Sequence, residues 1–131
     1  MIEMARLKGS KATDNKIRWE ADVDGTAFKL YIPKWRVPEP WPQVIDVTIS
    51  PHAQRPLAKL PPDAARKSPG SRAVPIEAHL ERFREHTQTV RYKPAGDPSE
   101  WEIGEPYIPA EMTFDSAKLL TITVKWQRSS G

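Results

Sequence analysis

The sequence predicts a mainly β protein of the α+β class. We expect a small, partly open antiparallel β-barrel, or a curved sheet, of about five to seven strands with one helix packed on it. Segments of alternating apolar and polar residues recur along the chain, turn residues separate them, and only one segment has its apolar residues at helical spacing. The 131 residues include no cysteine, and a chain of this length buries a core without disulfides.

The domain organisation follows from where the regular patterns lie. We expect residues 1–15 to form a flexible N-terminal arm, residues 16–127 a single β-rich domain and residues 128–131 a C-terminal tail. No apolar run approaches the roughly 20 residues of a membrane helix, and the first residues lack the apolar core of a signal peptide. We therefore expect a cytoplasmic protein with no membrane partner.

A β-hairpin is the clearest local prediction. The segments "KIRWEADV" and "TAFKLYI" flank Asp24-Gly25, a two-residue signal for a type I′ turn. Such a turn sets Ile17 opposite Ile32 and Trp19 opposite Leu30. One face of the hairpin is then wholly apolar, and the other pairs opposite charges and places a cation beside an aromatic ring.

The segment after the hairpin, "IPKWRVPEPWPQV", has four prolines and two tryptophans in residues 32–44 and is called the Pro-Trp segment below. Pro33 ends the hairpin strand, because proline cannot donate to a ladder. Two interpretations of Trp35 and Trp41 stay open. They either close one end of the barrel as buried rings or stand exposed on stiff backbone as a binding site. A further strand, "QVIDVTIS", follows at 43–50.

A long loop and one helix come next. Residues 51–75 contain six prolines and five lysines or arginines, and loops of this length are usually functional or disordered. A helix is predicted over 76–86, where Ile76, Leu80 and Phe83 share one face. Its acidic residues lie early and its basic residues late, which suits the helix dipole.

The last third of the chain returns to strands. "TQTVRYK" has a strand pattern, and the acidic, proline-containing segment 94–115 indicates turns around short edge strands at 101–103 and 111–114. "KLLTITVKWQ", at 118–127, is a strong alternating strand.

Charge is sorted along the chain. The net charge is +3, residues 52–93 carry +5 and residues 94–115 carry −6. The two stretches either pair with each other inside the fold or present two faces of opposite sign. A pI near 9.3 favours a polyanionic partner, although weakly.

Catalytic and metal-binding patterns are missing from the sequence. The six glycines are scattered, whereas a phosphate loop needs them clustered, and no serine lies in a Gly-x-Ser-x-Gly segment. His79 and His86 are seven residues apart rather than at the i, i+4 spacing that suits zinc. We expect a non-enzymatic binding protein with no cofactor and no metal. An enzyme with its site between the helix and the proline-rich loops is a weaker alternative.

The remaining features predict binding of nucleic acid, with single strands favoured. Cations neutralise phosphates, and exposed aromatic rings stack on bases. The predicted contact residues lie in the Pro-Trp segment and the long loop, and they are Lys34, Trp35, Arg36, Trp41, Arg55, Lys59, Arg66, Lys67 and Arg72. This prediction requires that these side chains share one open surface.

A protein-interaction module or self-assembling scaffold is the alternative function. The proline-rich segments at 33–42 and 94–109 offer rigid extended backbone on which a partner docks, or beside which it adds a strand to an edge. Patches of opposite charge would also support self-association.

Overall fold

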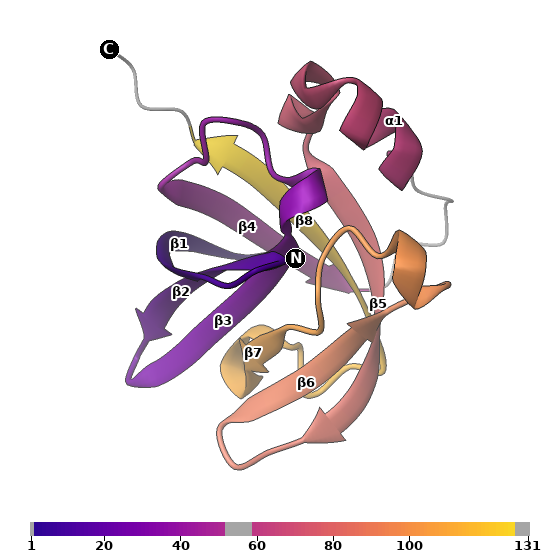
Figure 1. Cartoon of the computed structure of the whole chain (residues 1–131). Coiled ribbons are helices and arrows are strands. Elements are labelled where there is room, and N and C mark those ends of the chain that lie inside the picture. Colours follow the sequence, from indigo (N-terminus) through magenta and orange to yellow (C-terminus); the bar gives the residue numbers. More distant parts are fainter. Residues whose placement is uncertain (1, 52–58, 128–131) are drawn as a thin grey trace.

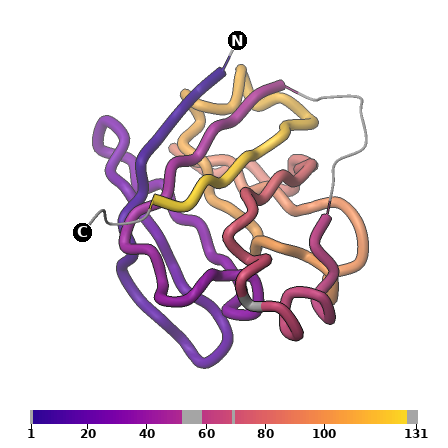
Figure 2. Tube along the Cα trace, turned by 90° about the horizontal axis from the view of Figure 1, so that it is seen from above, coloured from indigo at the N-terminus to yellow at the C-terminus, as the bar shows by residue number. Residues whose placement is uncertain are grey.

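The computed structural model describes residues 2–51 and 59–127, in which eight antiparallel strands form a closed barrel and one short α-helix lies outside it (Figure 1). The strands are β1 (Glu3–Ala12), β2 (Lys16–Val23), β3 (Thr26–Pro33), β4 (Val44–Pro51), β5 (Ile76–Glu85), β6 (Thr89–Pro94), β7 (Tyr107–Pro109) and β8 (Leu119–Gln127). Their order around the ring is β1-β2-β3-β7-β6-β5-β8-β4, and β4 pairs with β1. Figure 2 shows the last strand running between β4 and β5. The predicted mainly β barrel with one helix is confirmed, but it is closed and has more strands than expected.

The β2–β3 hairpin has the predicted turn and register. Asp24 and Gly25 have φ values of 50° and 87°, the positive values that a type I′ turn requires. Ile17 lies opposite Ile32 and Trp19 opposite Leu30, and all four side chains are buried. The apolar face of this hairpin forms one wall of the core.

The N-terminal arm predicted over 1–15 is wrong for most of its length, because β1 occupies residues 3–12. β1 pairs with both β2 and β4, and its buried Leu7 lies opposite Ile45. On the outer surface Arg6 Nε lies 2.9 Å from Asp46 Oδ1. Leu7 is the one fully buried side chain of β1, so the apolar pattern is too sparse to reveal a strand that its two neighbours stabilise.

The helix predicted over 76–86 is also wrong, because this segment forms β5. Along β5, Ile76 lies opposite Val124 of β8 and Leu80 opposite Leu120. The spacing of the apolar residues fits a strand as well as a helix here. Ring closure needs a strand between β8 and β6, and this long-range pairing overrides local helix propensity.

The described parts of the connections contain only short helices. The α-helix α1 (Pro62–Lys67) and the 3₁₀ turn η2 (Pro69–Ala73) lie in the predicted 51–75 loop, of which residues 52–58 are outside the described part. The other 3₁₀ turns are η1 (Lys34–Arg36), η3 (Pro98–Glu100) and η4 (Ala110–Met112). The edge strands predicted at 101–103 and 111–114 are absent, and the strand of this region is β7. Among the described residues, no helix has the length and apolar character needed to cross a bilayer.

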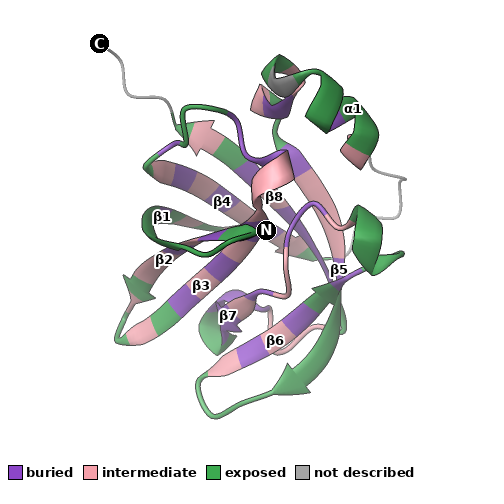
Figure 3. Ribbon diagram, viewed as in Figure 1, coloured by how far each residue is buried: buried purple, intermediate pink, exposed green. Residues whose placement is uncertain are grey.

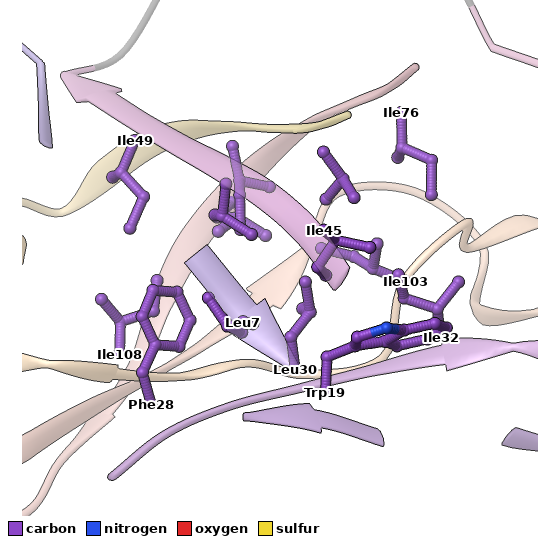
Figure 4. Packing of buried hydrophobic residues seen from close by; sticks show 14 of the residues in the cluster. Leu7, Trp19, Phe28, Leu30, Ile32, Ile45, Ile49, Ile76, Ile103 and Ile108 are labelled. Atoms are coloured by element: carbon purple, nitrogen blue, oxygen red, sulfur yellow. The ribbon is translucent and has the colours of Figure 1, made fainter. Parts of the chain in front are cut away.

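The core fills the inside of the barrel. Along β3, β4 and β6 buried residues alternate with more exposed ones (Figure 3), as expected for a sheet with one buried face. In Figure 4, side chains from several strands gather in one cluster, with Phe28 of β3 beside Ile108 of β7 towards one end and Trp19, Ile32 and Ile103 towards the other. Trp19 is fully buried and its ring centroid lies 6.1 Å from that of Trp126.

Candidate nucleic-acid interface

Arg36, a predicted phosphate contact, lies inside the protein. Its side chain is only 1% exposed, and its Nε lies 2.6 Å from Oε2 of the buried Glu102. The remaining guanidinium nitrogens donate to the carbonyl oxygens of Arg72, Val74 and Pro75. A buried cation needs this degree of compensation, so Arg36 joins the barrel to its loops and is not available to a nucleic acid.

Arg72, another predicted contact residue, is also buried and does not lie on an open surface. Its residue is buried, its Nε donates to the carbonyl oxygen of Ala65, and its Nη1 lies 3.6 Å from a carboxylate oxygen of Glu39. The prediction of an exposed cation is therefore wrong for Arg36 and Arg72. It placed both side chains in solvent, whereas their guanidinium groups contact backbone carbonyls and carboxylates of the chain itself.

The two tryptophans of the Pro-Trp segment divide between the two open interpretations. Trp41 is 41% exposed, and the Nζ of Lys34 lies 5.1 Å from its ring centroid. Trp35 is half-buried within η1. The segment is also held to the barrel, because Trp19 Nε1 donates to the carbonyl oxygen of Pro42 at 3.2 Å. Trp41 thus fits the exposed interpretation.

The other predicted residues differ in position. Lys59, Arg66 and Lys67 are exposed, the last two on α1, whereas Arg55 lies outside the described residues. Lys59 borders a small hollow of about 80 Å³ with Trp101, and Trp41 borders a different one, of about 600 Å³. The described members of the predicted set therefore do not line one common hollow.

A second group of rings and cations, which sequence reasoning missed, covers the outside of β5, β6 and β7. The register of β5 against β6 shifts between Arg82 and Arg84, so Phe83 is the extra residue of a bulge and is 52% exposed. The guanidinium carbon of Arg91 lies 5.1 Å from the Phe83 ring centroid, and the Nζ of Lys93 lies 5.8 Å from it. Figure 3 shows the end of β5 exposed over its last residues.

Arg91 connects this ring to a second pair of rings. Its guanidinium carbon lies 5.4 Å from the centroid of Tyr107, and Tyr107 is nearly parallel to His86 at 6.0 Å between centroids. Glu105 accepts a hydrogen bond from Arg91 Nε at 2.7 Å, which holds the guanidinium between the rings. Phe83, His86, Arg91, Lys93 and Tyr107 are called the ring–cation cluster below.

A hollow of about 390 Å³ adjoins the ring–cation cluster. His86 and Tyr107 line it together with hydroxyl, amide and amine groups of the two flanking hairpins, which are those of Thr26, Lys29, Thr87, Gln88 and Thr89. Lys29 lies opposite Tyr107, and this is the single register pair between β3 and β7 among the described residues. The hollow therefore lies where β3 continues beyond its pairing with β7, next to exposed rings.

The sequence contains a strand pattern at 76–80 that would have indicated this cluster, but the same residues were assigned to the helix predicted over 76–86. With 76–86 as a helix, Phe83 is assigned to the core and His86 to its border. In the strand, Phe83 lies three residues after the buried Leu80 and therefore faces outward. The alternation of Val90 and Tyr92 inward leaves Arg91 and Lys93 outside. Recognising the strand pattern of 76–80 would have placed the cations beside the ring.

Comparison with known proteins does not assign this chain to a family. The chain matches no protein-family model and no curated protein sequence.

Proposed function

We propose that this protein binds single-stranded nucleic acid through the ring–cation cluster and the hollow beside it. The observation that carries the proposal is an exposed phenylalanine and a half-buried tyrosine with arginine and lysine heads against their rings. Single strands are bound in this way without sequence preference, because every base has a face that stacks and every nucleotide carries a phosphate.

Each part of the cluster has a distinct role in this proposal. Phe83, which extends from the bulge, stacks on one base, and Lys93 beside it neutralises a phosphate. Arg91 keeps its Nη groups in addition to the Nε that Glu105 occupies, so it binds a second phosphate or stacks between bases. The hydroxyl and amide groups of the hollow, from residues such as Thr87 and Gln88, supply hydrogen bonds for the edge of an unpaired base.

A duplex fits this arrangement less well than a single strand. The bases of a duplex are already stacked on one another, so they cannot stack on Phe83 or enter the hollow without unpairing. We therefore expect duplexes to bind only through phosphate contacts, more weakly and with little dependence on the rings.

The experiment is a titration of labelled single-stranded DNA and RNA, and of the matching duplexes, followed by fluorescence anisotropy at low and moderate salt. Phe83→Ala is expected to weaken single-strand binding by roughly 1–3 kcal/mol, the usual contribution of one stacked base. Met4→Ala is the matched control, because Met4 is also an exposed apolar side chain but lies on β1, outside the cluster. Equal losses in both variants, or no binding at low salt, would refute the proposal.

The cations are tested by the salt dependence of binding. Arg91→Gln with Lys93→Gln is expected to lower the salt slope by about 0.7 for each lost phosphate contact. Lys125→Gln, on the outside of β8, is the control and leaves the slope unchanged. The alternative, a self-assembling interaction module, has a different outcome. Any oligonucleotide binding is then independent of these side chains and stays unchanged in the variants, and light scattering shows that the protein self-associates.

A further inference from the structure

The hollow that Trp41 borders lies away from the ring–cation cluster and has the features of a small-molecule site. It holds about 600 Å³, within the range of ligand pockets, and lies between the Pro-Trp segment and the outside of β1, β4 and β8. Its walls are formed by Arg6, Lys8, Pro38, Glu39, Pro40, Trp41, Pro42, Gln43, Val44 and Gln127. None of these residues belongs to the ring–cation cluster.

The apolar wall of this hollow is fixed to the barrel. The carbonyl oxygen of Pro42 accepts a hydrogen bond from the buried Trp19, and that of Gln43 accepts one from Gly9 N at 2.8 Å. Pro38 and Pro42 are themselves buried, so the backbone on both sides of Trp41 is held in place. Lys34 contacts the Trp41 ring but is not among the residues that line the hollow.

The polar wall is organised by one carboxylate. Asp46 accepts a hydrogen bond from Arg6 Nε at 2.9 Å and another from the side-chain amide of Gln127. These bonds keep Arg6 and Gln127 on the wall. The amide oxygen of Gln127 remains as an acceptor, and the Arg6 side chain is 66% exposed. The hydrogen bond from Arg6, ahead of that from Gln127 and the nearby charge of Lys125, holds the pKa of Asp46 below its ordinary value.

The hollow offers cationic donors to an anion. Arg6 and Lys8 both line it, and the ion pair with Asp46 engages Arg6 Nε, so the two Nη groups of Arg6 are the donors that an anion would contact. Glu39, the one acidic lining residue, lies within ion-pair distance of Arg72. The hollow thus combines an exposed indole, two cations and the side-chain amides of Gln43 and Gln127. A planar heterocycle with a phosphate group matches this combination, because the indole stacks, the amides pair with a ring edge and the cations bind phosphate.

We propose that this hollow binds a single nucleotide, with its base on Trp41 and its phosphate on Arg6 and Lys8. Two sources share this chemistry, a free nucleotide and the phosphorylated end of a strand. The outer row of the barrel connects the two sites: Lys8 lies opposite Glu20, Glu20 opposite Lys29, and Lys29 opposite Tyr107. Three strand-to-strand steps span about 14 Å, which is roughly four stacked nucleotides.

The test uses the intact chain and adenosine 5′-monophosphate, with adenosine and inorganic phosphate as separate probes. Calorimetry is expected to show that the nucleotide binds more tightly than either probe. Trp41→Ala is expected to weaken this binding roughly five- to 150-fold, the equivalent of one lost stacking contact. Trp41→Phe, which keeps an aromatic ring, restores most of it. Amide chemical shifts are expected to change at residues of the hollow and not at the ring–cation cluster.

Two matched variants distinguish specific binding of the nucleotide in the hollow from non-specific electrostatic attraction of its phosphate. Arg6→Gln removes a lining cation, whereas Lys125→Gln removes a cation near Asp46 that does not line the hollow. The proposal expects a loss in the first variant alone. Equal losses in both, binding no tighter than that of phosphate, or shifts outside the hollow would overturn it. Because shift mapping is done on the unaltered chain, the proposal remains testable if a variant does not fold.

A competition experiment identifies the source of the nucleotide and keeps this proposal separate from strand binding. Oligonucleotides with a terminal phosphate displace the nucleotide if the hollow holds a strand end, whereas those without one do not. If neither competes, the free nucleotide is the ligand. Phe83→Ala is expected to leave nucleotide binding unchanged. Failure of strand binding at the cluster would therefore not remove a nucleotide bound at Trp41.

Discussion

Replacing Glu102 with glutamine isolates the contribution of the buried ion pair to stability. Glu102→Gln keeps the size of the side chain but leaves the Arg36 guanidinium, 1% exposed, without a compensating charge. Removal of one partner of a buried pair costs about 3–5 kcal/mol, against about 0–1 kcal/mol for an exposed pair. Domains of this kind have a free energy of unfolding of roughly 5–15 kcal/mol, so the loss is a large fraction of the total.

Replacing the arginine is expected to cost at least as much. Arg36→Met removes the donor for three backbone carbonyls, those of Arg72, Val74 and Pro75, as well as the partner of Glu102. Each buried group left without a partner costs about 1–3 kcal/mol. The double variant is expected to be less destabilised than the sum of the two single variants, since neither charge then remains unpaired.

Urea unfolding followed by tryptophan fluorescence measures these changes, and thermal unfolding provides a second reading. For a chain of this size a loss of 3–5 kcal/mol lowers the melting temperature by roughly 10–20 °C. A loss below about 1 kcal/mol for Glu102→Gln would refute the reasoning, because it would mean that the pair behaves as a solvated one. In variants that remain folded, the salt slope of oligonucleotide binding stays unchanged, because Arg36 contacts no phosphate.

Three further predictions concern single side chains. Trp19→Phe removes the donor to Pro42, so it is expected to weaken nucleotide binding beside Trp41, as calorimetry will show. Because it also shrinks a fully buried side chain, it is expected to lower the melting temperature, as thermal unfolding will show. Burial raises the pKa of Tyr92, whose hydroxyl donates to the Ala117 carbonyl oxygen at 2.6 Å; a tyrosinate signal that appears late in an alkaline absorbance titration of the folded protein should vanish in Tyr92→Phe, which is expected to cost about 1 kcal/mol. The pKa of Asp46 is lowered on folding, so its contribution is present above the ordinary value of 3.8 and is lost as the pH falls through the folded pKa. Asp46→Asn should therefore be less stable than the unchanged chain at pH 6, and the difference should shrink as the pH falls below 3.8, by urea unfolding at a series of pH values; a constant difference would contradict the sign.

Local sequence signals predicted the elements whose partners are close in the chain. Asp24-Gly25 specifies both the turn and the register of the β2–β3 hairpin, because a two-residue loop leaves one pairing that buries all the apolar side chains. The strong alternation of 118–127 is similarly unambiguous. Ring closure depends instead on partners far apart in sequence. Residues 3–12 become a strand because β2 and β4 flank them, and 76–85 because β6 and β8 do.

The candidate sites depend on the same distant contacts. Composition identified Arg36 as basic, but its role follows from Glu102, which lies 66 residues away in sequence. Phe83 has an apolar side chain at helical spacing from Leu80, and it faces the surface only because the segment is a strand, in which residues three apart point to opposite sides. Trp41 is exposed, as one of the two open interpretations had it, since prolines on both sides keep it out of a regular strand. Its cationic neighbour Arg6, however, is brought there by β1.

The seam between β3 and β7 is the shortest in the ring. β7 has three residues, and it meets β3 at the Lys29–Tyr107 pair, with one further hydrogen bond from Gly104 N to the Tyr31 carbonyl oxygen. Fluctuations that part the wall should begin at this seam, so the amides around it should exchange with solvent before those between β4 and β8. A ligand bound across Lys29 and Tyr107 would hold β3 and β7 together. The free energy of its binding would then add to the free energy needed to open the barrel at this seam.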